Sequence, residues 1–317
     1  MSPKLETSRR AKPALHWNVE RVVSELRALR LNALEQRQKQ DRPPKMPSRA
    51  NLTAVLEGLC AALFPNRLGP PDLTDEGVDY FVGHTLETQL RALFEEIRLE
   101  LSFASGLTGK GGADHQRRAF EITREFAAHL PEVRRILETD IQAGYQGDPA
   151  AKSLDEVLVC YPGTTAIAYH RIAHVLHRLG APLVARIIAE IAHSETGIDI
   201  HPAAQIGGSF FIDHGTGVVI GETAIIGERV RLYQAVTLGA KRFPVDESGV
   251  LIKGNARHPI VEDDVVIYAG ATILGRITIG RGSVIGGNVW LTRSVPPGSH
   301  ISQAQVRNEL FEAGAGI

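Results

Sequence analysis

The segment GIDIHPAAQIGGSFFIDHGTGVVIGETAIIGERVRLYQAVTLGA (197–240) and its continuation PIVEDDVVIYAGATILGRITIGRGSVIGGNVWL (259–291) decide the fold. In both, an aliphatic residue returns at every sixth position, usually with a small or apolar residue two places earlier. This period fits neither an amphipathic helix nor an alternating strand, and it is typical of a hexapeptide solenoid built from triangular coils. It predicts about four coils, roughly 20 Å of stacked strands. The aliphatic positions are Ile200, Ile206, Ile212, Ile220, Ile226, Leu232, Leu238, Val261, Ile267, Ile273, Ile279, Ile285 and Leu291.

The ladder first breaks between Ile212 and Ile220, where the step is eight residues instead of six. The break contains Asp213 and His214, and Asp199 lies fifteen residues before His214. A carboxylate that holds one imidazole nitrogen leaves the other as a general base near neutral pH, and Asp199 can approach from a neighbouring position in the stack. The alternative is a surface turn with a solvated histidine, because Asp-His-Gly is also ordinary turn sequence.

The second break lies between Leu238 and Val261 and holds an excursion loop over residues 240–257. A long loop that leaves a regular solenoid is usually functional or disordered, and this one returns at Arg257 and His258. A guanidinium and an imidazole together can bind a carboxylate, although both can equally be solvated loop residues. No Walker-type or dinucleotide glycine motif accompanies the basic residues that could meet phosphates. These residues are Lys241, Arg242 and Lys253.

The N-terminal half predicts an all-α domain over residues 17–196, preceded by a poorly ordered stretch over 1–16. Ser48 is placed to cap a helix that Pro65 stops, and Gly197 marks the seam with the solenoid. Such apolar helices need partners, so this half can serve as a scaffold or oligomerisation module. Helices are expected from Asn18, from Ser48 to Phe64, around 86–101, and over 113–129, 132–145, 152–159, 164–179 and 182–194. Residues 301–317 are expected to be a C-terminal tail.

Composition excludes several classes of protein. The chain has 317 residues with 35 basic and 36 acidic side chains, a balance that gives no electrostatic argument for nucleic acid or an anionic membrane. Cys60 and Cys160 cannot form a disulfide framework, which favours a reducing compartment. The first residues lack the apolar core of a signal peptide, and no run of about 18 apolar residues exists. We therefore expect a cytoplasmic protein without a membrane anchor.

The run YHRIAHVLH (169–177) places His170, His174 and His177 on one face of a predicted helix. This spacing can suggest a metal site. The glutamate of the helical zinc-protease motif is missing between the first two histidines. The alternative, a packed or capping helix face, is favoured.

Several segments together resemble serine O-acetyltransferase, an enzyme family that acetylates L-serine from acetyl-CoA in cysteine biosynthesis. The combination of DIHP, IDHxTG and RHP separates this family from other hexapeptide acyltransferases. The resemblance covers about residues 135–300, and the residues before it look more like the subgroup with a longer N-terminal region. The segments are DIQAGYQGDPA (140–150), YHRIAHVLH (169–177), GIDIHPAAQIGGSFFIDHGTGVVIGETAIIG (197–227), AVTLGA (235–240), ARHPIVEDDVVIYAGATILG (256–275) and SVPPG (294–298).

The resemblance implies a role for each matching polar residue. His214 is expected to be the general base, Asp199 its orienting partner and His258 the second active-site histidine. Arg257 would bind the serine carboxylate. The serine ammonium would be held by Asp148 and Asp213.

The resemblance also implies a left-handed parallel β-helix after the helical domain, an α+β chain that is an exception to the right-handed crossover rule. Acetyl-CoA, a co-substrate rather than a bound cofactor, would lie in a groove lined by Gly239, Ala269 and Gly287. Family members form trimers with sites between neighbouring prisms, often paired into hexamers. No metal takes part, and L-cysteine is expected to inhibit at the serine site because it differs from serine only by sulfur for oxygen.

Two departures from the family pattern concern the C-terminal end and the loop. The segment 303–307 replaces the usual GVPAR-like closing sequence, and the excursion loop is longer than in short members. The chain ends in Ile317, and in the family a C-terminal isoleucine inserts into O-acetylserine sulfhydrylase. The same partner is therefore expected here.

Three other interpretations stay open from the sequence. The chain can be a hexapeptide acyltransferase with another acceptor, because Asp148, Asp213 and Arg257 favour an α-amino acid without specifying serine. It can be a zinc enzyme of the γ-carbonic anhydrase type, although His201, His214 and His258 are widely spaced. It can also be a catalytically silent scaffold.

Overall fold

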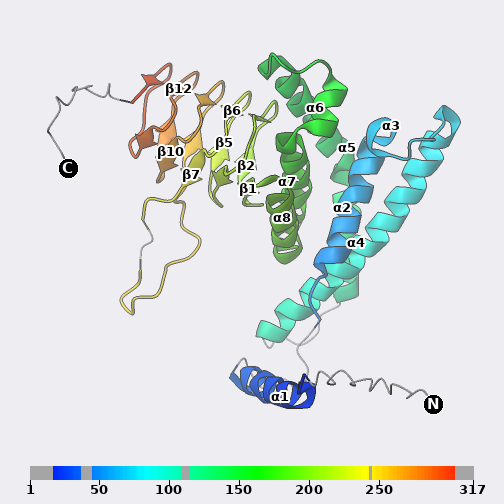
Figure 1. Cartoon of the computed structure of the whole chain (residues 1–317). Helices are drawn as coiled ribbons and strands as arrows, with labels where there is room; N and C mark the ends of the chain where they lie inside the picture. Colours follow the sequence, from blue (N-terminus) through cyan, green and yellow to red (C-terminus); the bar gives the residue numbers. More distant parts are fainter. Residues whose placement is uncertain (1–16, 37–44, 109–114, 243–244, 304–317) are drawn as a thin grey trace, which may run out of the picture. The chain divides into compact units, whose positions relative to one another are not determined.

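A computed structural model describes residues 17–36, 45–108, 115–242 and 245–303, in two compact units (Figure 1). The first unit, Met1–Pro44, contains helix α1 (Val19–Gln36). Its apolar residues Val19, Val22, Val23 and Leu26 are between 49% and 59% exposed within the chain. The helix expected from Asn18 is confirmed, whereas the prediction for residues 1–16 lies outside the described residues.

The second unit, Lys45–Ile317, begins with the helical domain. The two helices expected over 113–129 and 132–145 are one helix, α5, that continues through Pro131. Its buried stripe runs on both sides of the proline, as at Phe126 and Val133, so burial outweighs the roughly 3 kcal/mol that an interior proline costs. The elements are α2 (Arg49–Leu63), α3 (Pro65–Leu68), a short 3₁₀ helix (Asp75–Gly77), α4 (Val78–Thr108), α5 (His115–Gly147), α6 (Leu154–Cys160), α7 (Pro162–Leu179) and α8 (Pro182–Thr196).

Two glutamates of α4 tie the helical domain together at helix N-termini. Glu96 accepts a hydrogen bond from the backbone of Ser48 at 2.6 Å, and Ser48 in turn caps α2 as predicted. Glu100 accepts from the backbone N–H groups of Leu183 and Val184, both at 2.8 Å, at the start of α8. The first N–H groups of a helix have no partner within the helix, so these carboxylates stabilise α2 and α8.

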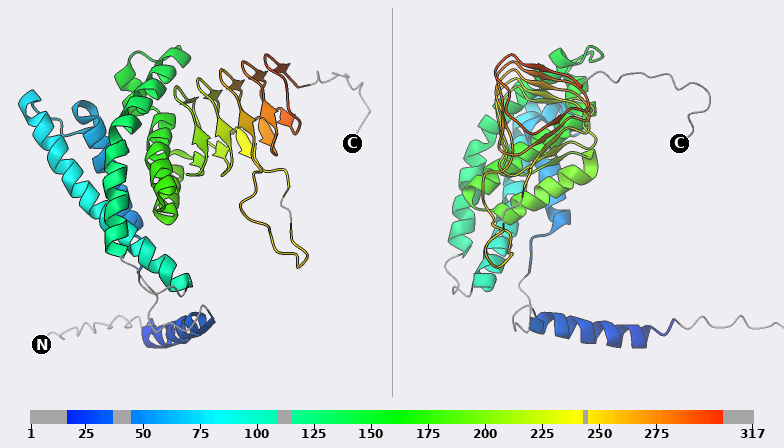
Figure 2. Two further views of the ribbon diagram at one scale, coloured as in Figure 1. Left: turned by 180° about the vertical axis from the view of Figure 1, so that it is seen from behind. Right: turned by 90° about the vertical axis from the view of Figure 1, so that its left-hand side faces the viewer.

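The C-terminal part is a parallel β-helix in which three sheets form the sides of a triangular prism (Figures 1 and 2). Sheet A has the strand order β1-β4-β7-β10-β13, sheet B β11-β8-β5-β2 and sheet C β14-β12-β9-β6-β3. The fold is the left-handed hexapeptide β-helix that the sequence predicts. The strands are β1 (Asp199–Ile200), β2 (Gln205–Ile206), β3 (Phe211–Ile212), β4 (Val219–Ile220), β5 (Ile225–Ile226), β6 (Arg231–Leu232), β7 (Thr237–Gly239), β8 (Ile260–Val261), β9 (Val266–Ile267), β10 (Thr272–Leu274), β11 (Thr278–Ile279), β12 (Val284–Ile285), β13 (Trp290–Leu291) and β14 (His300–Ile301).

The register of the strands places the sixth-position residues inside the prism. In sheet A, for example, Ile220 pairs with Leu238 and Leu238 with Ile273, and all three are buried. The prism has a fifth rung beyond the predicted four, because β13 and β14 extend two sheets and Val295 bridges to Ile279 in the third. The prism therefore continues to Ile301 without the family's usual closing sequence.

A buried ion pair joins the helical domain to the first coil. The guanidinium of Arg171 (α7) donates to both carboxylate oxygens of Asp140 (α5), at 2.7 and 2.9 Å. It also donates to the backbone carbonyls of Ile206 and Gly207, and Asp140 accepts from the backbone of Phe210 at 2.9 Å. Each guanidinium nitrogen of Arg171 and each carboxylate oxygen of Asp140 thus has at least one hydrogen-bond partner, as burial requires. None of the helices in the described ranges has the length and apolar character needed to cross a bilayer.

Candidate active site

The first break in the ladder forms a widened corner between sheets C and A. Residues 213–218 link β3 to β4, whereas residues 233–236 link β6 to β7 one coil further on. The backbone N–H of Asp213 bonds to Leu232, and the N–H of Ala235 bonds to Thr216. The two additional residues of the corner are therefore His214 and Gly215, as the step of eight predicts.

His214 projects from this widened corner into solvent. Its side chain is 70% exposed, and Nδ1 lies 3.7 Å from the carboxylate of Asp213, which is only 13% exposed. The turn depends on Gly215, whose φ is +87° and whose missing Cβ would lie 2.4 Å from a side-chain carbon of Ile198. The corner thus presents an accessible imidazole next to a sheltered carboxylate.

Asp148 approaches the same corner from the loop after α5. Its Oδ1 accepts from the backbone of Ala150 at 2.8 Å, and its Oδ2 accepts from the hydroxyl of Tyr161 at 2.5 Å. The hydrogen bond from Tyr161, then that from Ala150 and the nearby charges of His214 and Arg231, lower the pKa of Asp148. Asp148 and Asp213 are two anions near one exposed imidazole, an arrangement suited to a small cationic group.

The return of the excursion loop forms a second polar corner, between sheets A and B. The guanidinium of Arg257 donates to Glu222 at 2.6 Å, in the coil before it. The hydroxyl oxygen of Thr223 accepts from the backbone N–H groups of Arg257 and His258, at 2.9 and 3.1 Å. Arg257 and His258 are therefore not merely solvated loop residues, because side chains of the preceding coil fix both.

The contacts of His258 define its protonation. Its Nδ1 accepts from the backbone N–H of Thr223 at 3.1 Å and lies 2.9 Å from the threonine hydroxyl. Burial, followed by the charge of Arg257, lowers the pKa of His258 to about 4. The imidazole is therefore neutral near pH 7, with its proton on Nε2 as a hydrogen-bond donor. The ring lies against Gly221, where a Cβ would come within 2.0 Å of Cδ2.

The two corners lie on different edges of the prism in one chain. Asp213 and His214 follow sheet C, whereas Arg257 and His258 precede sheet B. Sheet A separates the two edges. A single chain therefore does not unite the two sets of residues.

The three residues expected to line the acetyl-CoA groove divide between the two edges. Ala269 and Gly287 lie on successive coils of the edge that carries His214, and the carbonyl of Ala269 accepts from Asn288 at 2.8 Å. Gly287 is close to the Ala269 carbonyl, 3.2 Å from the position of a Cβ. Gly239 ends β7, at the start of the excursion loop.

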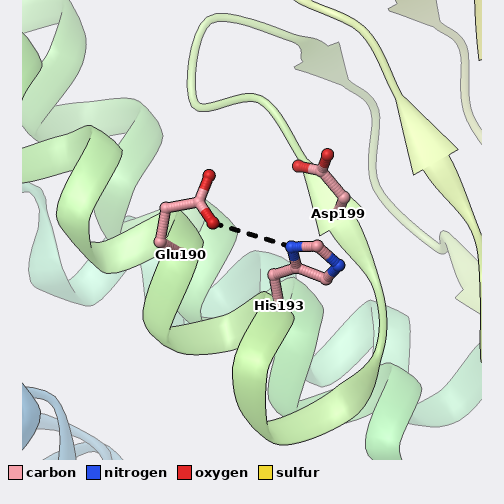
Figure 3. A group of neighbouring side chains, drawn as sticks. All are labelled: Glu190, His193 and Asp199. Atoms are coloured by element: carbon pink, nitrogen blue, oxygen red, sulfur yellow. Dashed lines mark ion pairs between the residues drawn. The ribbon is translucent and has the colours of Figure 1, made fainter.

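Asp199 lies at the start of β1 with its carboxylate near α8, where it groups with Glu190 and His193 (Figure 3). Among the described residues no hydrogen bond or ion pair joins Asp199 to His214. Glu190, His193 and Asp199 each offer an oxygen or nitrogen within 4.8 Å of the others, the only such group in the part of the chain that the structure describes. The guanidinium of Arg186 already donates a hydrogen bond to the carboxylate of Glu190 at 2.7 Å, and the three side chains are partly exposed. The group is therefore poorly suited to bind a metal ion.

The histidines of α7 pack against the first coil, as the favoured interpretation predicts. His170 is 3% exposed, and its Nδ1 has no partner among the described residues. His174 Nδ1 bonds the carbonyl of Pro202 at 2.9 Å, and His177 contacts His201 edge to face. Burial lowers the pKa of His170, of His174 and of His201, so these imidazoles are neutral packing groups.

The site also contains residues that no sequence motif indicates. Tyr161 bonds Asp148, and Glu222 and Thr223 hold Arg257 and His258. Tyr161 stands directly before the proline that starts α7, and Glu222 and Thr223 lie one coil before Arg257 and His258. The length of one coil could have indicated that Glu222 and Thr223 lie next to Arg257 and His258. The hydrogen bond of Tyr161 depends instead on how two loops meet in the fold.

A scan against protein families agrees with this architecture. Residues 258–293 match the family described as bacterial transferase hexapeptide (six repeats). The match covers part of the prism and indicates the class of hexapeptide-repeat transferases. A plasmid serine acetyltransferase of Synechococcus elongatus is 58% identical over 304 residues, 95% of each chain. The chain belongs to the serine acetyltransferase family.

Further relatives and solved structures lead to the same family. A serine acetyltransferase of Mycobacterium tuberculosis is 51% identical over 158 residues, covering 50% of this chain and 65% of its own. Serine acetyltransferase isoform 3 of Entamoeba histolytica, solved with cysteine, has a TM-score of 0.69 at 32% identity and covers 92% of this chain and 94% of its own. The Neisseria gonorrhoeae enzyme, solved with serine, has a TM-score of 0.52 at 29% identity, over 80% of this chain and 95% of its own.

Proposed function

We propose that the chain transfers the acetyl group of acetyl-CoA to the hydroxyl of L-serine, giving O-acetyl-L-serine and CoA for L-cysteine biosynthesis. The observation that carries this proposal is the convergence of Asp148, from the helical domain, with Asp213 and His214 at the widened corner. Two carboxylates, the sheltered Asp213 and the partly exposed Asp148, suit the ammonium of an amino acid, and the exposed imidazole beside them suits its hydroxyl. The family relationship supports serine as the acceptor.

In this mechanism His214 accepts the proton of the serine hydroxyl while the oxygen attacks the thioester carbonyl. The tetrahedral intermediate collapses as the C–S bond breaks, and the CoA thiolate takes the proton from the imidazolium. Asp199 orients His214 in this scheme. Because the carboxylate of Asp199 lies with Glu190 and His193 in the isolated chain, this step requires the side chain to turn towards His214.

The binding of the serine carboxylate requires the second corner. Arg257 and the neutral Nε2–H of His258 form a suitable donor pair, but they lie on another edge of the prism. A threefold arrangement of prisms would bring this edge of one copy against the His214 edge of the next. We therefore propose a homotrimer, or a dimer of trimers through the helical domains, with three sites between copies.

The proposed cleft between copies also accounts for acetyl-CoA, which is a co-substrate rather than a resident cofactor. Ala269 and Gly287 leave a shallow strip for the pantetheine arm next to His214. A cavity of about 500 Å³ lies elsewhere, under α5, but one of about 370 Å³ lies at the base of the excursion loop. The smaller cavity is lined by the cations Lys241, Arg242 and Arg276, which suit phosphates, and it extends to Arg257.

Two further relationships follow from the same site. L-cysteine would inhibit, because a pocket for serine discriminates poorly against a near-isostere, and solved relatives are described in complex with cysteine. Ile317 would bind O-acetylserine sulfhydrylase, although this residue lies outside the described ranges. A cytoplasmic location is proposed because the two free cysteines, Cys60 and Cys160, suit a reducing compartment.

The decisive assay is thiol release from acetyl-CoA with and without L-serine. Release is expected to depend on L-serine and to fall by about 10³-fold in His214→Ala, since loss of a general base removes 10²–10⁴ of the rate. His84→Ala changes an exposed histidine on α4, outside the proposed machinery, so this variant should keep its activity and serves as the control. Serine-independent turnover, full activity of His214→Ala, or stoichiometric zinc between copies would reject the assignment and favour the other acceptors or the zinc-enzyme interpretation.

A further inference from the structure

We propose that Tyr161 is the positioning residue of the ammonium subsite, because its hydroxyl fixes the carboxylate of Asp148 in the orientation that receives the substrate amine. This inference rests on the proposed function, and it concerns a residue for which the sequence predicts no role. Tyr161 contacts Asp148 rather than the reacting atoms, so it acts through that carboxylate.

Hydrogen bonds from the protein hold both oxygens of the Asp148 carboxylate. Each oxygen of Asp148 has one donor from the protein, the hydroxyl of Tyr161 at 2.5 Å for Oδ2 and the backbone N–H of Ala150 at 2.8 Å for Oδ1. A carboxylate oxygen can accept about two hydrogen bonds, so one acceptor direction on each oxygen stays open. A carboxylate held at both oxygens presents these directions at fixed places.

Tyr161 is itself held in place by α7 and β3. It is the N-cap residue of α7, and its carbonyl accepts from Thr164 at 3.0 Å. Its ring packs at a tilt on Phe211 of β3, with 6.4 Å between ring centroids. α7 starts directly against the corner strand, because Gly163 leaves no room for a Cβ beside the carbonyl of Ile212. The position of the hydroxyl is thus coupled to β3, which leads directly to Asp213.

The surroundings of Tyr161 keep its phenol protonated. The hydrogen bond to Asp148, followed by burial and neighbouring carboxylates that include Asp213, raises the pKa of Tyr161 to about 12. The phenol therefore remains a donor throughout the physiological range. The same hydrogen bond is the largest cause that lowers the pKa of Asp148, so it favours the charged form of that carboxylate.

The two carboxylates also affect which acceptors bind. Asp148 and Asp213 can bind a substrate that has an α-ammonium, whereas a substrate without one leaves their charge unsatisfied. Loosening Asp148 should weaken this preference without changing how acetyl-CoA binds. Tyr161 would thereby set the preference for an amino acid over a simple alcohol.

The test is the variant Tyr161→Phe, which removes only the hydroxyl and keeps the ring on Phe211. We expect the KM for L-serine to rise about fivefold, which corresponds to about 1 kcal/mol at about 1.4 kcal/mol per tenfold, while the KM for acetyl-CoA and kcat stay within twofold. The acid limb of kcat/KM for L-serine should move to higher pH, because Asp148 loses the main cause of its lowered pKa. A purely structural role for Tyr161 would not move this limb.

Tyr145→Phe is the matched control, since it deletes an exposed phenol hydroxyl on α5, 40% exposed and close in sequence to Asp148. An unchanged serine KM and an unchanged acid limb in Tyr161→Phe would overturn the inference while the proposed function stands. A parallel loss of melting temperature and of affinity for both substrates would assign Tyr161 to folding and overturn it too. Absence of serine turnover in the unmodified protein would instead reject the proposed function, and the inference with it.

Discussion

Two aspartates near the end of α5 lie in contrasting surroundings. Asp140 is 4% exposed, and Arg171 and the backbone of Phe210 occupy its oxygens. Asp148 has one protein donor on each oxygen and lies near a second carboxylate, Asp213, which forms an ion pair with His214. Asp140 therefore joins the helical domain to the first coil, whereas Asp148 keeps acceptor directions that can bind a substrate cation.

This contrast separates stability from function in physical terms. A buried charge that is fully paired holds its partners in place, and its removal leaves the other charge unpaired. A partly exposed carboxylate with open acceptor directions contributes little to stability and can bind a cation. The same side chain type therefore serves the seam at one position and the proposed site at the other.

The largest effect is expected from breaking the satisfied pair. Arg171→Leu should lower the free energy of unfolding by about 3–5 kcal/mol, because Asp140 is left charged and buried. Chemical denaturation monitored by circular dichroism measures the change. The double variant Asp140→Leu/Arg171→Leu should recover part of the loss, and a double variant less stable than Arg171→Leu would contradict this account of the seam.

Asp148→Asn tests the open carboxylate and should leave stability almost unchanged. The KM for L-serine is expected to rise about 10- to 100-fold, the usual range for a lost hydrogen bond to a charged group. Steady-state kinetics with both substrates varied, together with a melting curve, separates this effect from misfolding. A fall of the melting temperature comparable to that of Arg171→Leu would show that the two aspartates do not differ as described.

Gly221→Ala tests whether the second corner needs its close packing. The new methyl group would lie about 2.0 Å from the present position of the His258 ring, which must move. We expect about a tenfold loss of kcat/KM for L-serine, since small displacements of positioning groups are costly. Gly83→Ala is the control, because nothing lies within 4 Å of its Cβ position. Equal activity of both variants would remove His258 from the site.

The smallest effect concerns pH. Burial holds the pKa of His258 at about 4, below its ordinary value of 6.5, and lowers the pKa of His170 and of His174 as well. As the pH falls, these histidines take up protons in the unfolded chain before they do so in the folded chain. The contribution of the neutral histidines to the free energy of unfolding should therefore be fully present above pH 6.5 and decrease as the pH drops towards 4. Melting temperatures across this window measure the slope. His258→Asn should reduce it, and an unchanged slope in that variant would contradict the assigned environment of His258.

The sequence predicts the prism better than the helical domain. The period of six identifies every strand from Ile200 to Leu291, because one buried position per hexad leaves a direct record in the sequence. The helical pattern does not show that α5 passes through Pro131, since tertiary burial decides that point. The step of eight predicts the place of His214, whereas the link between Tyr161 and Asp148 joins two loops whose meeting no local pattern encodes.

The central claim is that one active site is built from two prism edges of neighbouring copies. Co-expression of His214→Ala and His258→Ala chains tests it most directly. Each variant alone should be nearly inactive, whereas mixed oligomers should contain intact sites in which the His214 edge of one variant meets the His258 edge of the other.

With equal expression and random assembly of a cyclic trimer, about a quarter of the sites would be intact. We therefore expect co-expressed chains to recover roughly a quarter of the serine-dependent thiol release of the unmodified protein. The separately purified variants, mixed without subunit exchange, should remain inactive. Co-expressed chains that are no more active than either variant alone would contradict a site shared between copies.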